Sequence, residues 1–530
     1  MTTEASMQSV RRYAGITIIA IAVLGVTGYV LWGTSQGLAG FPLDDAWIHQ
    51  TYARNLAETG QLAYLPGQPS AGSTSPAWTF LLSIGYLLKV DFRLWTYLLG
   101  AICLAATAWL TYRLYLRLPG MHRHLGWASQ PAAALLAGLF CAVEWHLVWA
   151  AASGMETILF TALSLALVEY FSSQVAMRQS GEGPASLQKE QAIVSSVGIG
   201  LLGGVLVLAR PEGAVLAGIV IAGLVIFPRP ADRSEVLSRL VATGLSLVAL
   251  GVVLAPYLAF NLRASGEIFP NTFYAKQVEY LVSWPLTVRF WRVLIPTLVG
   301  AQVLLVPGVC YAAYMLIRRQ QWPALLPLVW WLALLSVYAV RLPVNYHHGR
   351  YVMPTIPWLI LYGVWGTTNA LRPRSPALAV RVISRGMPVA VALLAVLFWG
   401  RGALAYSDDV AFIEGEMVAM ARWLEENTVP DTIIAVHDIG AVGYLTDRPL
   451  LDLAGLITPE VIPIMTDAER LAEWMQERGA GYAVFFPDFS STYQQLDTMF
   501  QQVYCTDFAW TRAAGHENMC AYLVAGGASP

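Results

Sequence analysis

Charged side chains are scarce in this sequence. Only 12% of its 530 residues are Asp, Glu, Lys or Arg, whereas a soluble globular domain carries about a quarter. Hydrophobic residues make up 56%, and the mean hydropathy is +0.54, which is typical of an integral membrane protein. The net charge of −2 also argues against the basic face or stripe that a nucleic-acid-binding protein would show, so we expect no nucleic-acid partner.

The N-terminus lacks the small-residue cleavage site of a secretory signal. Arg11 and Arg12 precede an apolar run over 14–33, and this run has the roughly 20 residues that a membrane-spanning helix needs. We therefore interpret it as a retained first span. The sequence also lacks internal repeats, which many transporters have.

Apolar runs alternate with polar connections along most of the chain. We expect eleven spans, because the run at 76–90 is only about fifteen residues long and is interpreted as re-entrant or incomplete. Connections rich in Arg should be cytoplasmic, which predicts a cytoplasmic N-terminus and external positions for the Asp44 segment and the C-terminal region. The other full-length or near-full-length runs are at about 94–116, 131–151, 155–173, 192–209, 212–228, 236–259, 294–316, 323–340, 352–371 and 387–405.

The composition becomes that of a soluble domain in the last quarter of the chain. We therefore divide the chain into a transmembrane domain, 1–406, and an extracytoplasmic domain, 407–530. Hydrophobic periodicity predicts alternating helices and strands there, which together indicate a small α/β domain. The predicted helices are 414–427, 467–478 and 492–500, and the predicted strands are 432–436, 450–453 and 482–486.

Cysteine is rare, and the five cysteines divide by location. Cys103, Cys141 and Cys310 lie in apolar runs and should be small buried hydrophobic residues. Cys505 and Cys520 lie on two short apolar segments separated by a polar stretch, a pattern that predicts antiparallel strands. If the domain is external, the two can form a disulfide; the alternative is two unpaired buried thiols.

The most informative motif is the acidic pair Asp44-Asp45, within a predicted external catalytic loop at 35–75. No helix breaker follows the pair, so Asp45, His49 and Tyr52 should share one helix face. Such a face can accept a proton from a sugar hydroxyl, and Asp45 with His49 can offer ligands to a divalent cation. The alternative is a capped interfacial helix with solvated carboxylates.

Charged residues also interrupt the apolar stretches at two other places. Glu156 follows Ser153 at a turn between two runs, where it either belongs to a helix cap or faces the same site. Arg210 and Glu212 flank a proline, and either form a structural ion pair or contact substrate.

Cationic candidates fall on the connections that we place outside. His347, His348 and Arg350 lie at the outer end of a run; Arg350 suits bidentate binding of phosphate, and the histidines suit metal or phosphate. Neighbouring tyrosines also suit simple interfacial anchoring. Lys276 lies on another external stretch, where it can meet a phosphate.

These motifs, in this order, resemble the GT-C superfamily of glycosyltransferases, in which an acidic motif follows the first span. More narrowly, residues of about 40–355 resemble the mycobacterial terminal β-(1→2) arabinofuranosyltransferase family and its bacterial relatives. The matching motifs are the thirteen residues from Asp44 to Leu56, Pro66-Gly67, Ser70 to Trp78, Ser153-Gly154-Met155-Glu156-Thr157, Arg210-Pro211-Glu212-Gly213, Pro270 to Lys276 and Gly349-Arg350-Tyr351.

The resemblance implies a polytopic α-helical enzyme of the cell membrane. It implies inverting transfer of a sugar from a polyprenyl-phosphate donor to a cell-surface glycan, with an aspartate of the pair as base. It leaves open a divalent metal, Mg²⁺ or Mn²⁺, at Asp45 and His49. The C-terminal domain matches that family less clearly, so the donor sugar and the acceptor are not carried over.

Two other functions remain compatible with the sequence. A transporter or flippase of lipid-linked sugars would carry charges near the bilayer midplane and show repeat symmetry. A non-catalytic surface-assembly protein would bind glycans through the outer domain. Replacing Asp44 and Asp45 separates an enzyme from a scaffold.

Overall fold

The computed structural model describes residues 2–120, 130–180, 185–229, 232–279, 284–371 and 375–524, without the side chains of 2–12, 180, 185–192 and 279. Parts of the predicted basic connections therefore lie outside the described residues, namely the side chains of Arg11 and Arg12 and the segments 121–124, 181–184, 230–231 and 372–374.

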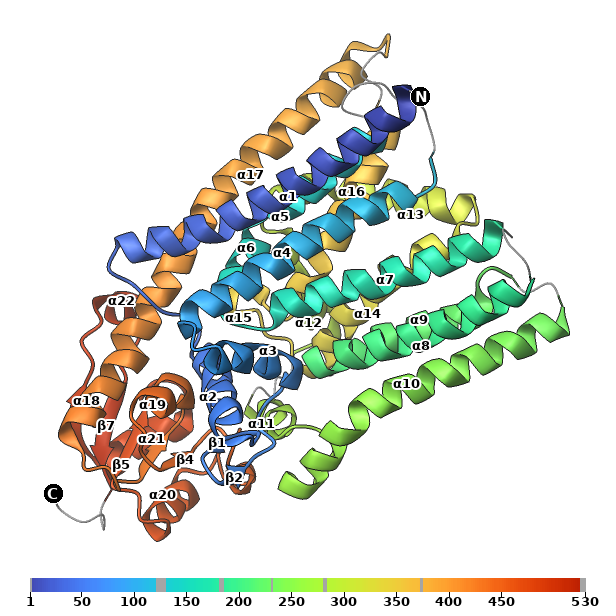
Figure 1. Cartoon of the computed structure of the whole chain (residues 1–530). Helices are drawn as coiled ribbons and strands as arrows, with labels where there is room; N and C mark the ends of the chain where they lie inside the picture. The colour runs from blue at the N-terminus through green and yellow to red at the C-terminus, as the bar shows by residue number, and fades with distance from the viewer. Residues whose placement is uncertain are drawn as a thin grey trace.

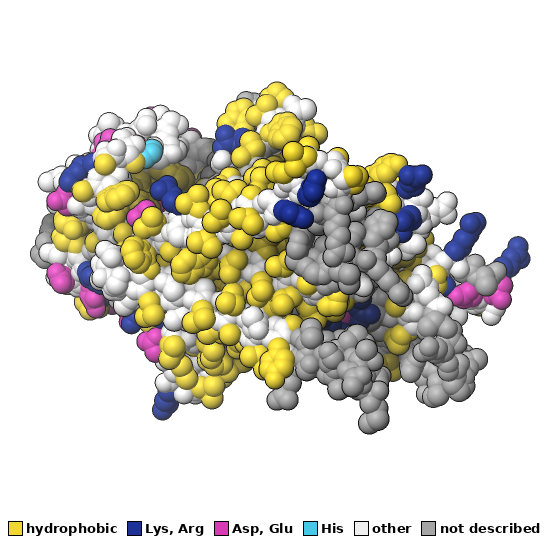
Figure 2. Space-filling model, turned by 90° about the horizontal axis from the view of Figure 1, so that it is seen from above, with side chains coloured by type: hydrophobic (Ala, Val, Ile, Leu, Met, Phe, Trp, Pro, Cys, Tyr) yellow, Lys and Arg dark blue, Asp and Glu magenta, His cyan; other side chains and the backbone are white. Residues whose placement is uncertain are grey.

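Most of the chain forms a bundle of long helices that run side by side (Figure 1). Seen from above, the bundle has a broad hydrophobic face, whereas charged side chains gather towards its two ends (Figure 2). This distribution suits a protein whose middle contacts lipid. The bundle helices are α1 (Thr2–Ser35), α4 (Phe92–Arg117), α5 (Gln130–Val143), α6 (Trp145–Ala152), α7 (Thr157–Ser180), α8 (Ala185–Ala209), α9 (Gly213–Ile226), α10 (Arg233–Ser265), α13 (Val306–Arg318), α14 (Leu326–Arg341), α16 (Ile356–Ala370) and α17 (Leu378–Ile413).

The expected count of eleven spans is not confirmed. Among the described residues, seven helices are long and apolar enough to cross a membrane, or eight if α5 and α6, bent by 49°, form one span. Glu144 lies at that break, where its side chain caps α6 by accepting from the Leu147 N–H. The predicted run 294–316 is also divided, because α12 (Leu286–Leu298) ends just before Gly300, and the short helix η2 (Ala301–Leu305) follows.

Several short elements form a layer at one end of the bundle (Figure 1). The helix α3 lies within the run 76–90 and has only 12 residues, which is too short to cross a bilayer. The helix α2 carries both aspartates in its first turn, where carboxylates favour a helix N-terminus. The elements of this layer are α2 (Asp44–Thr59), β1 (Ala63–Leu65), β2 (Gln68–Pro69), α3 (Pro76–Leu87), α11 (Asn271–Glu279), α15 (Tyr346–Gly349) and η4 (Met353–Thr355).

The C-terminal region is an α/β domain built on a five-stranded sheet with the order β4-β3-β5-β7-β6. The strand β3 is parallel to β4 and β5, whereas β7 is antiparallel to β5 and β6. The strands are β3 (Ile434–Val436), β4 (Leu450–Asp452), β5 (Tyr482–Phe485), β6 (Gln501–Cys505) and β7 (Cys520–Leu523). The helices are η5 (Glu414–Val418), α18 (Ala419–Asn427), α19 (Ile439–Leu445), η6 (Pro459–Val461), α20 (Ala468–Glu477), α21 (Ser491–Met499) and α22 (Ala509–Ala513).

Cys505 and Cys520 face each other across β6 and β7 and form a disulfide. The sequence predicted both strands, but their connection also contains α22, which the sequence analysis missed. The predicted boundary after residue 406 lies inside a helix, because α17 continues through η5 and α18 to Asn427. The two domains are therefore joined by a continuous helix rather than by a loop.

The C-terminal domain packs directly on α2 and its hairpin. The Tyr64 hydroxyl donates to the Ile439 carbonyl at 2.5 Å, and the Arg54 guanidinium donates to the Tyr444 carbonyl at 3.2 Å. These contacts hold α19 beside α2, so residues of both domains surround the two aspartates.

Candidate active site

Asp45 lies between two cations that come from distant parts of the chain. The Arg350 guanidinium donates to Asp45 Oδ2, and Lys276 Nζ lies 3.9 Å from the same oxygen. Burial alone would raise the pKa of Asp45, but the two cations hold that pKa well below its usual range. Asp45 is therefore a fully ionised carboxylate in this arrangement.

Asp44 has the opposite environment. It accepts hydrogen bonds from the backbone N–H groups of Gly440 at 2.6 Å and Ala441 at 2.8 Å, at the N-terminus of α19. Burial and the nearby Asp438 carboxylate raise the pKa of Asp44 to about 7, although the two backbone N–H groups oppose the shift. A Cβ atom at residue 440 would lie 2.6 Å from the Asp44 carboxylate, so the contact requires glycine.

Tyr351 joins the two cations. Its hydroxyl oxygen accepts from Lys276 Nζ at 2.9 Å and from Arg350 Nη2 at 3.1 Å, and lies 3.1 Å from the Tyr346 hydroxyl. Burial opposes ionisation of this phenol, but Arg350 and Lys276 lower its pKa to about 8. The sequence pattern suggested interfacial anchoring for these tyrosines, although the position of Tyr351 beside Arg350 was a usable signal.

Arg350 has unused hydrogen-bonding capacity. Its side chain is only 4% exposed. Its Nε and Nη1 atoms are buried and have no hydrogen-bond partner among the described residues. Because an unsatisfied buried donor is costly, this guanidinium is prepared for an anionic ligand.

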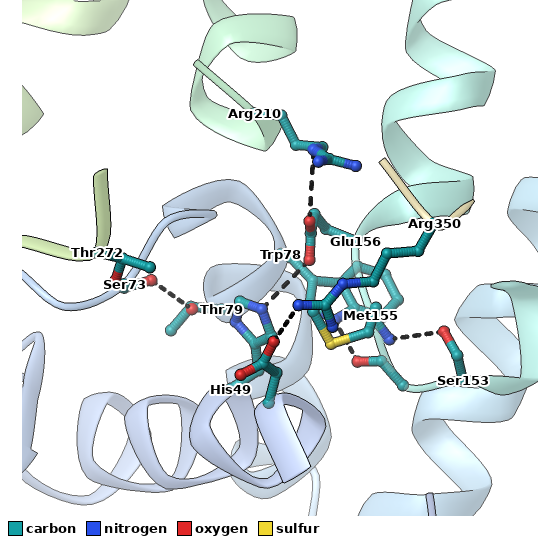
Figure 3. Close-up of polar contacts among 12 residues, drawn as sticks. His49, Ser73, Trp78, Thr79, Ser153, Met155, Glu156, Arg210, Thr272 and Arg350 are labelled. Carbon is teal, nitrogen blue, oxygen red and sulfur yellow. Dashed lines mark hydrogen bonds and ion pairs between the residues drawn. The ribbon is translucent and has the colours of Figure 1, made fainter. Parts of the chain in front are cut away.

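A second buried cluster lies beside the first. His49 and Arg210 point at Glu156 from opposite sides (Figure 3). His49 Nε2 is 3.2 Å from one carboxylate oxygen, and Arg210 Nε is 3.6 Å from the other. Burial would raise the pKa of Glu156, but His49 and Arg210 lower it to about 2.

Arg210 also holds Glu212, since its Nε lies 2.7 Å from Glu212 Oε1. Arg210 Nη2 donates to the Tyr338 hydroxyl at 2.8 Å, and this hydroxyl donates in turn to Glu212. Glu212 is therefore engaged by the protein itself, which favours the structural ion pair of the two alternatives left by the sequence.

The two histidines that follow Tyr346 point to different places. His348 Nε2 is 2.7 Å from Asp409 Oδ2 on α17, and the Trp149 indole donates to the same oxygen at 2.9 Å. His347 lines a cavity beside Asp45, and burial together with Arg350 lowers its pKa well below the usual range. The sequence predicted His347 and His348 as one group, but only His347 lies at the Asp45 site.

Asp45 lies where two cavities meet. The larger has a volume of about 960 Å³ and extends between the bundle and the C-terminal domain. The smaller, about 380 Å³, is lined by His49, Glu156, Arg210 and Tyr351. Both cavities are lined by Asp45, Ile48, Lys276, Arg350 and Leu456.

These residues do not fit a divalent metal. The described residues contain no group of three His, Cys, Asp or Glu side chains that could hold an ion. Asp45 pairs with two cations, and His49 pairs with Glu156, so the two predicted ligands have different partners. The predicted Mg²⁺ or Mn²⁺ ion therefore gains no support from the geometry.

Solved structures with the same fold are available for comparison. ArnT from Cupriavidus metallidurans, in a structure with bound undecaprenyl phosphate, is 16% identical and aligns with a TM-score of 0.60 over 97% of this chain and 99% of that chain. The apo oligosaccharyltransferase from Archaeoglobus fulgidus is 12% identical, with a TM-score of 0.58 over 89% and 70%. The chain therefore has the GT-C fold, and the predicted fold class is confirmed.

The other comparisons add little about function. The mycobacterial arabinofuranosyltransferase AftD aligns with a TM-score of only 0.49, at 16% identity, over 98% of this chain and 42% of that chain, which is too weak to assign a sugar. Residues 405–522 match a domain of unknown function, DUF8728. No curated protein matches the sequence.

Proposed function

We propose that this chain, which folds as the GT-C glycosyltransferases do, transfers a sugar with inversion from a polyprenyl-phosphate donor to a cell-surface glycan. The observation that carries the proposal is the position of Asp45 and Arg350 at the junction of two cavities. The carboxylate can serve as a base, and the guanidinium, which has donors without hydrogen-bond partners, can bind a phosphate. A glycosyl transfer from a phosphate-linked donor needs both groups at one place. The comparison structures include complexes with undecaprenyl phosphate and with a dolichol-phosphate.

Arg350 and Lys276 are the proposed ligands of the donor phosphate. Both are permanently cationic, lie against the same Asp45 oxygen and line both cavities. A phosphate that entered here would take over the free Nε and Nη1 donors of Arg350. Tyr351, whose hydroxyl group lies between the same two cations, would form a hydrogen bond with the phosphate.

Asp45 is the proposed base. Paired with two cations it is a weak base, because its pKa is held low. Donor phosphate competes for the same cations, and this competition would raise the basicity of Asp45 only when the donor is bound. Asp45 then takes the proton from the acceptor hydroxyl while that oxygen attacks the anomeric carbon. The bond between the anomeric carbon and the phosphate oxygen breaks, and its electron pair leaves with the polyprenyl phosphate. Because this is a single displacement, the configuration at the anomeric carbon is inverted.

Glu156 is the proposed contact for donor sugar hydroxyls. His49 and Arg210 keep it ionised at the wall of the smaller cavity. Its position in the same cavity as Arg350 allows one donor molecule to reach both. Glu212, already held by Arg210 and Tyr338, serves to fix Arg210.

The reaction would take place at the outer face of the membrane. The acidic pair and the C-terminal domain lie at one end of the bundle, and the N-terminus lies at the other (Figure 1). The predicted Arg-rich connections favour a cytoplasmic N-terminus. A donor supplied as a lipid-linked sugar suits this side of the membrane.

A donor panel tests the proposal. The purified full-length protein in lipid nanodiscs would receive radiolabelled polyprenyl-phosphate sugars together with extracted cell-surface glycans, and released polyprenyl phosphate would be measured. We expect release from at least one lipid-linked donor and none in Asp45→Asn. Transfer from nucleotide sugars would overturn the proposal. Donor binding without turnover across the panel would favour transport or scaffolding instead.

A further inference from the structure

The C-terminal domain forms a large part of the wall of the larger cavity. Its contribution comes from loops at the ends of β3, β4 and β5 and from the connection around α22. The same cavity reaches Asp45, so a molecule that lies against this domain can present a hydroxyl group to the proposed base. The polar and aromatic residues of this wall include His437, Asp438, Asp488, Phe489, Trp510 and Glu517.

Two aromatic side chains of this wall are unusually exposed. Trp510 is 66% exposed and Phe489 is 44% exposed, although both are large hydrophobic residues on a folded domain. Exposed aromatic rings beside a cavity normally mark a binding surface. Such rings can pack against the C–H faces of a sugar, and the neighbouring carboxylates can accept hydrogen bonds from its hydroxyl groups.

The charge of the larger cavity limits what it can bind. Its cations, Lys276 and Arg350, lie together at the Asp45 end of the cavity. Asp44 is held by backbone N–H groups. The other acidic residues of the lining are Asp408, Asp409, Asp438, Asp488 and Glu517. The part of the lining that the C-terminal domain contributes has Asp438, Asp488 and Glu517 and no lysine or arginine. This wall repels anionic ligands and accepts neutral polyols, whereas the cations lie at the Asp45 end of the cavity.

Two acidic side chains of this wall, Asp488 and Asp438, are paired with histidines. His516 Nδ1 lies 2.7 Å from Asp488 Oδ2, and His437 Nδ1 lies 3.2 Å from Asp438 Oδ2. Each pairing leaves a second carboxylate oxygen that can receive a hydroxyl hydrogen bond. Asp488 is next to Phe489, so the aromatic ring and a carboxylate acceptor are available to the same ligand.

We propose that the C-terminal domain forms the acceptor subsite and selects an uncharged sugar residue, which packs on Trp510 and Phe489 and donates hydroxyl hydrogen bonds to Asp488 and Glu517. This inference rests on the proposed function, because it places the acceptor between the domain and Asp45. It assigns the recognition of the acceptor to the domain and the recognition of the donor to the bundle.

Binding can be tested separately from catalysis. Saturation-transfer NMR would measure binding of neutral methyl glycosides and of methyl glycosides of uronic acids to the full-length protein in nanodiscs. We expect binding of a neutral glycoside and a loss of affinity of at least about fivefold in Trp510→Ala and Asp488→Asn. Met499→Ala is the matched control, since Met499 is 47% exposed on α21 and does not line the cavity.

The outcomes separate this inference from the proposed function. Unchanged glycoside binding in Trp510→Ala and Asp488→Asn, or a preference for the uronic acids, would overturn the subsite. Equal losses in Met499→Ala would also overturn it, because they would indicate general unfolding. Glycoside binding that depends on Trp510 in a protein with no turnover would refute the proposed transferase and retain the subsite.

Discussion

Asp44 and Asp45 are adjacent in the sequence but lie in opposite electrostatic environments. Asp45 faces Arg350 and Lys276 at the junction of the cavities, whereas Asp44 caps α19 and lies near the Asp438 carboxylate. Adjacent residues in the first turn of a helix point in directions about 100° apart, which is enough to separate their roles. One carboxylate is therefore available for chemistry, and the other holds two domains together.

The first prediction ranks the two aspartates. Asp45→Asn should lower turnover by at least about a hundredfold, the scale of a lost general base. Asp44→Asn should cost less, because the amide oxygen can still accept a backbone N–H bond. Single-turnover kinetics with bound donor would measure both. A larger loss in Asp44→Asn than in Asp45→Asn would contradict the assignment of the base.

The second prediction concerns Arg350. Arg350→Ala should weaken binding of polyprenyl phosphate, and Arg350→Lys should restore it only in part, because lysine lacks the planar fork. Arg341→Ala is a suitable control, since this side chain lines the smaller cavity but hydrogen-bonds Gln277. Donor affinity can be measured by native mass spectrometry. Equal affinity in wild type and Arg350→Ala would remove Arg350 from the phosphate site.

At the scale of elements, the contact between α2 and α19 determines how the domain closes on the bundle. The third prediction is that this contact depends on pH. When α19 is docked on α2, Asp44 has a pKa of about 7, above its ordinary value of 3.8. Between pH 3.8 and 7, docking is therefore accompanied by uptake of a proton by Asp44. The contact should therefore be strongest below pH 4 and weaken as the pH rises through 7.

Hydrogen exchange measures this dependence. After correction for intrinsic exchange rates, protection of the amides at 440–441 should fall as the pH rises, whereas the amides of α21 serve as an internal control. Asp44→Asn, which cannot ionise, should lose the dependence. A pH profile that is the same in wild type and Asp44→Asn would refute the prediction.

The fourth prediction concerns the bridge between β6 and β7. The disulfide closes a loop with a sequence separation of 15, and such a loop corresponds to about 3 kcal/mol in the free energy of unfolding. Cys520→Ala should therefore lower the Tm of the C-terminal domain in the full-length protein, as followed by limited proteolysis. Cys310 lies outside the domain on α13 and is exposed, so the expectation that it is buried was wrong. Cys310→Ser should therefore leave the Tm unchanged.

At the scale of the whole molecule, the bundle separates the end that carries α2 and the C-terminal domain from the end that carries the N-terminus. The fifth prediction is that Gln61→Cys, near α2, and Val429→Cys, in the C-terminal domain, are labelled from outside the cell. Gln320→Cys, between α13 and α14, should be labelled only from the cytoplasm. All three cysteine variants would be made in a protein that carries Cys310→Ser, because Cys310 is the exposed free cysteine among the described residues. Labelling of residues 61 and 429 from different sides would refute the arrangement.

The local pattern of hydrophobic and polar residues was sufficient to predict much of the fold and part of the site. Strands at 432–436, 450–453 and 482–486 were predicted, and the structure has β3, β4 and β5 there. The number of spans could not be obtained in this way. Hydropathy does not register the break near Glu144, and the runs 192–209 and 212–228 form apolar helical segments of only 10–17 residues. Helix α19 was missed, since seven residues carry too little periodicity.

The sequence by itself determined that this is a multi-pass membrane protein with an α/β domain, since hydropathy and periodicity are local properties. It also identified Asp45, Lys276 and Arg350 as candidates, because charged residues beside apolar runs are conspicuous. Only the tertiary structure decided that these three residues meet, that Asp44 holds α19, and that the C-terminal domain covers the larger cavity. These facts depend on packing between segments hundreds of residues apart, and local sequence does not encode their distance or direction.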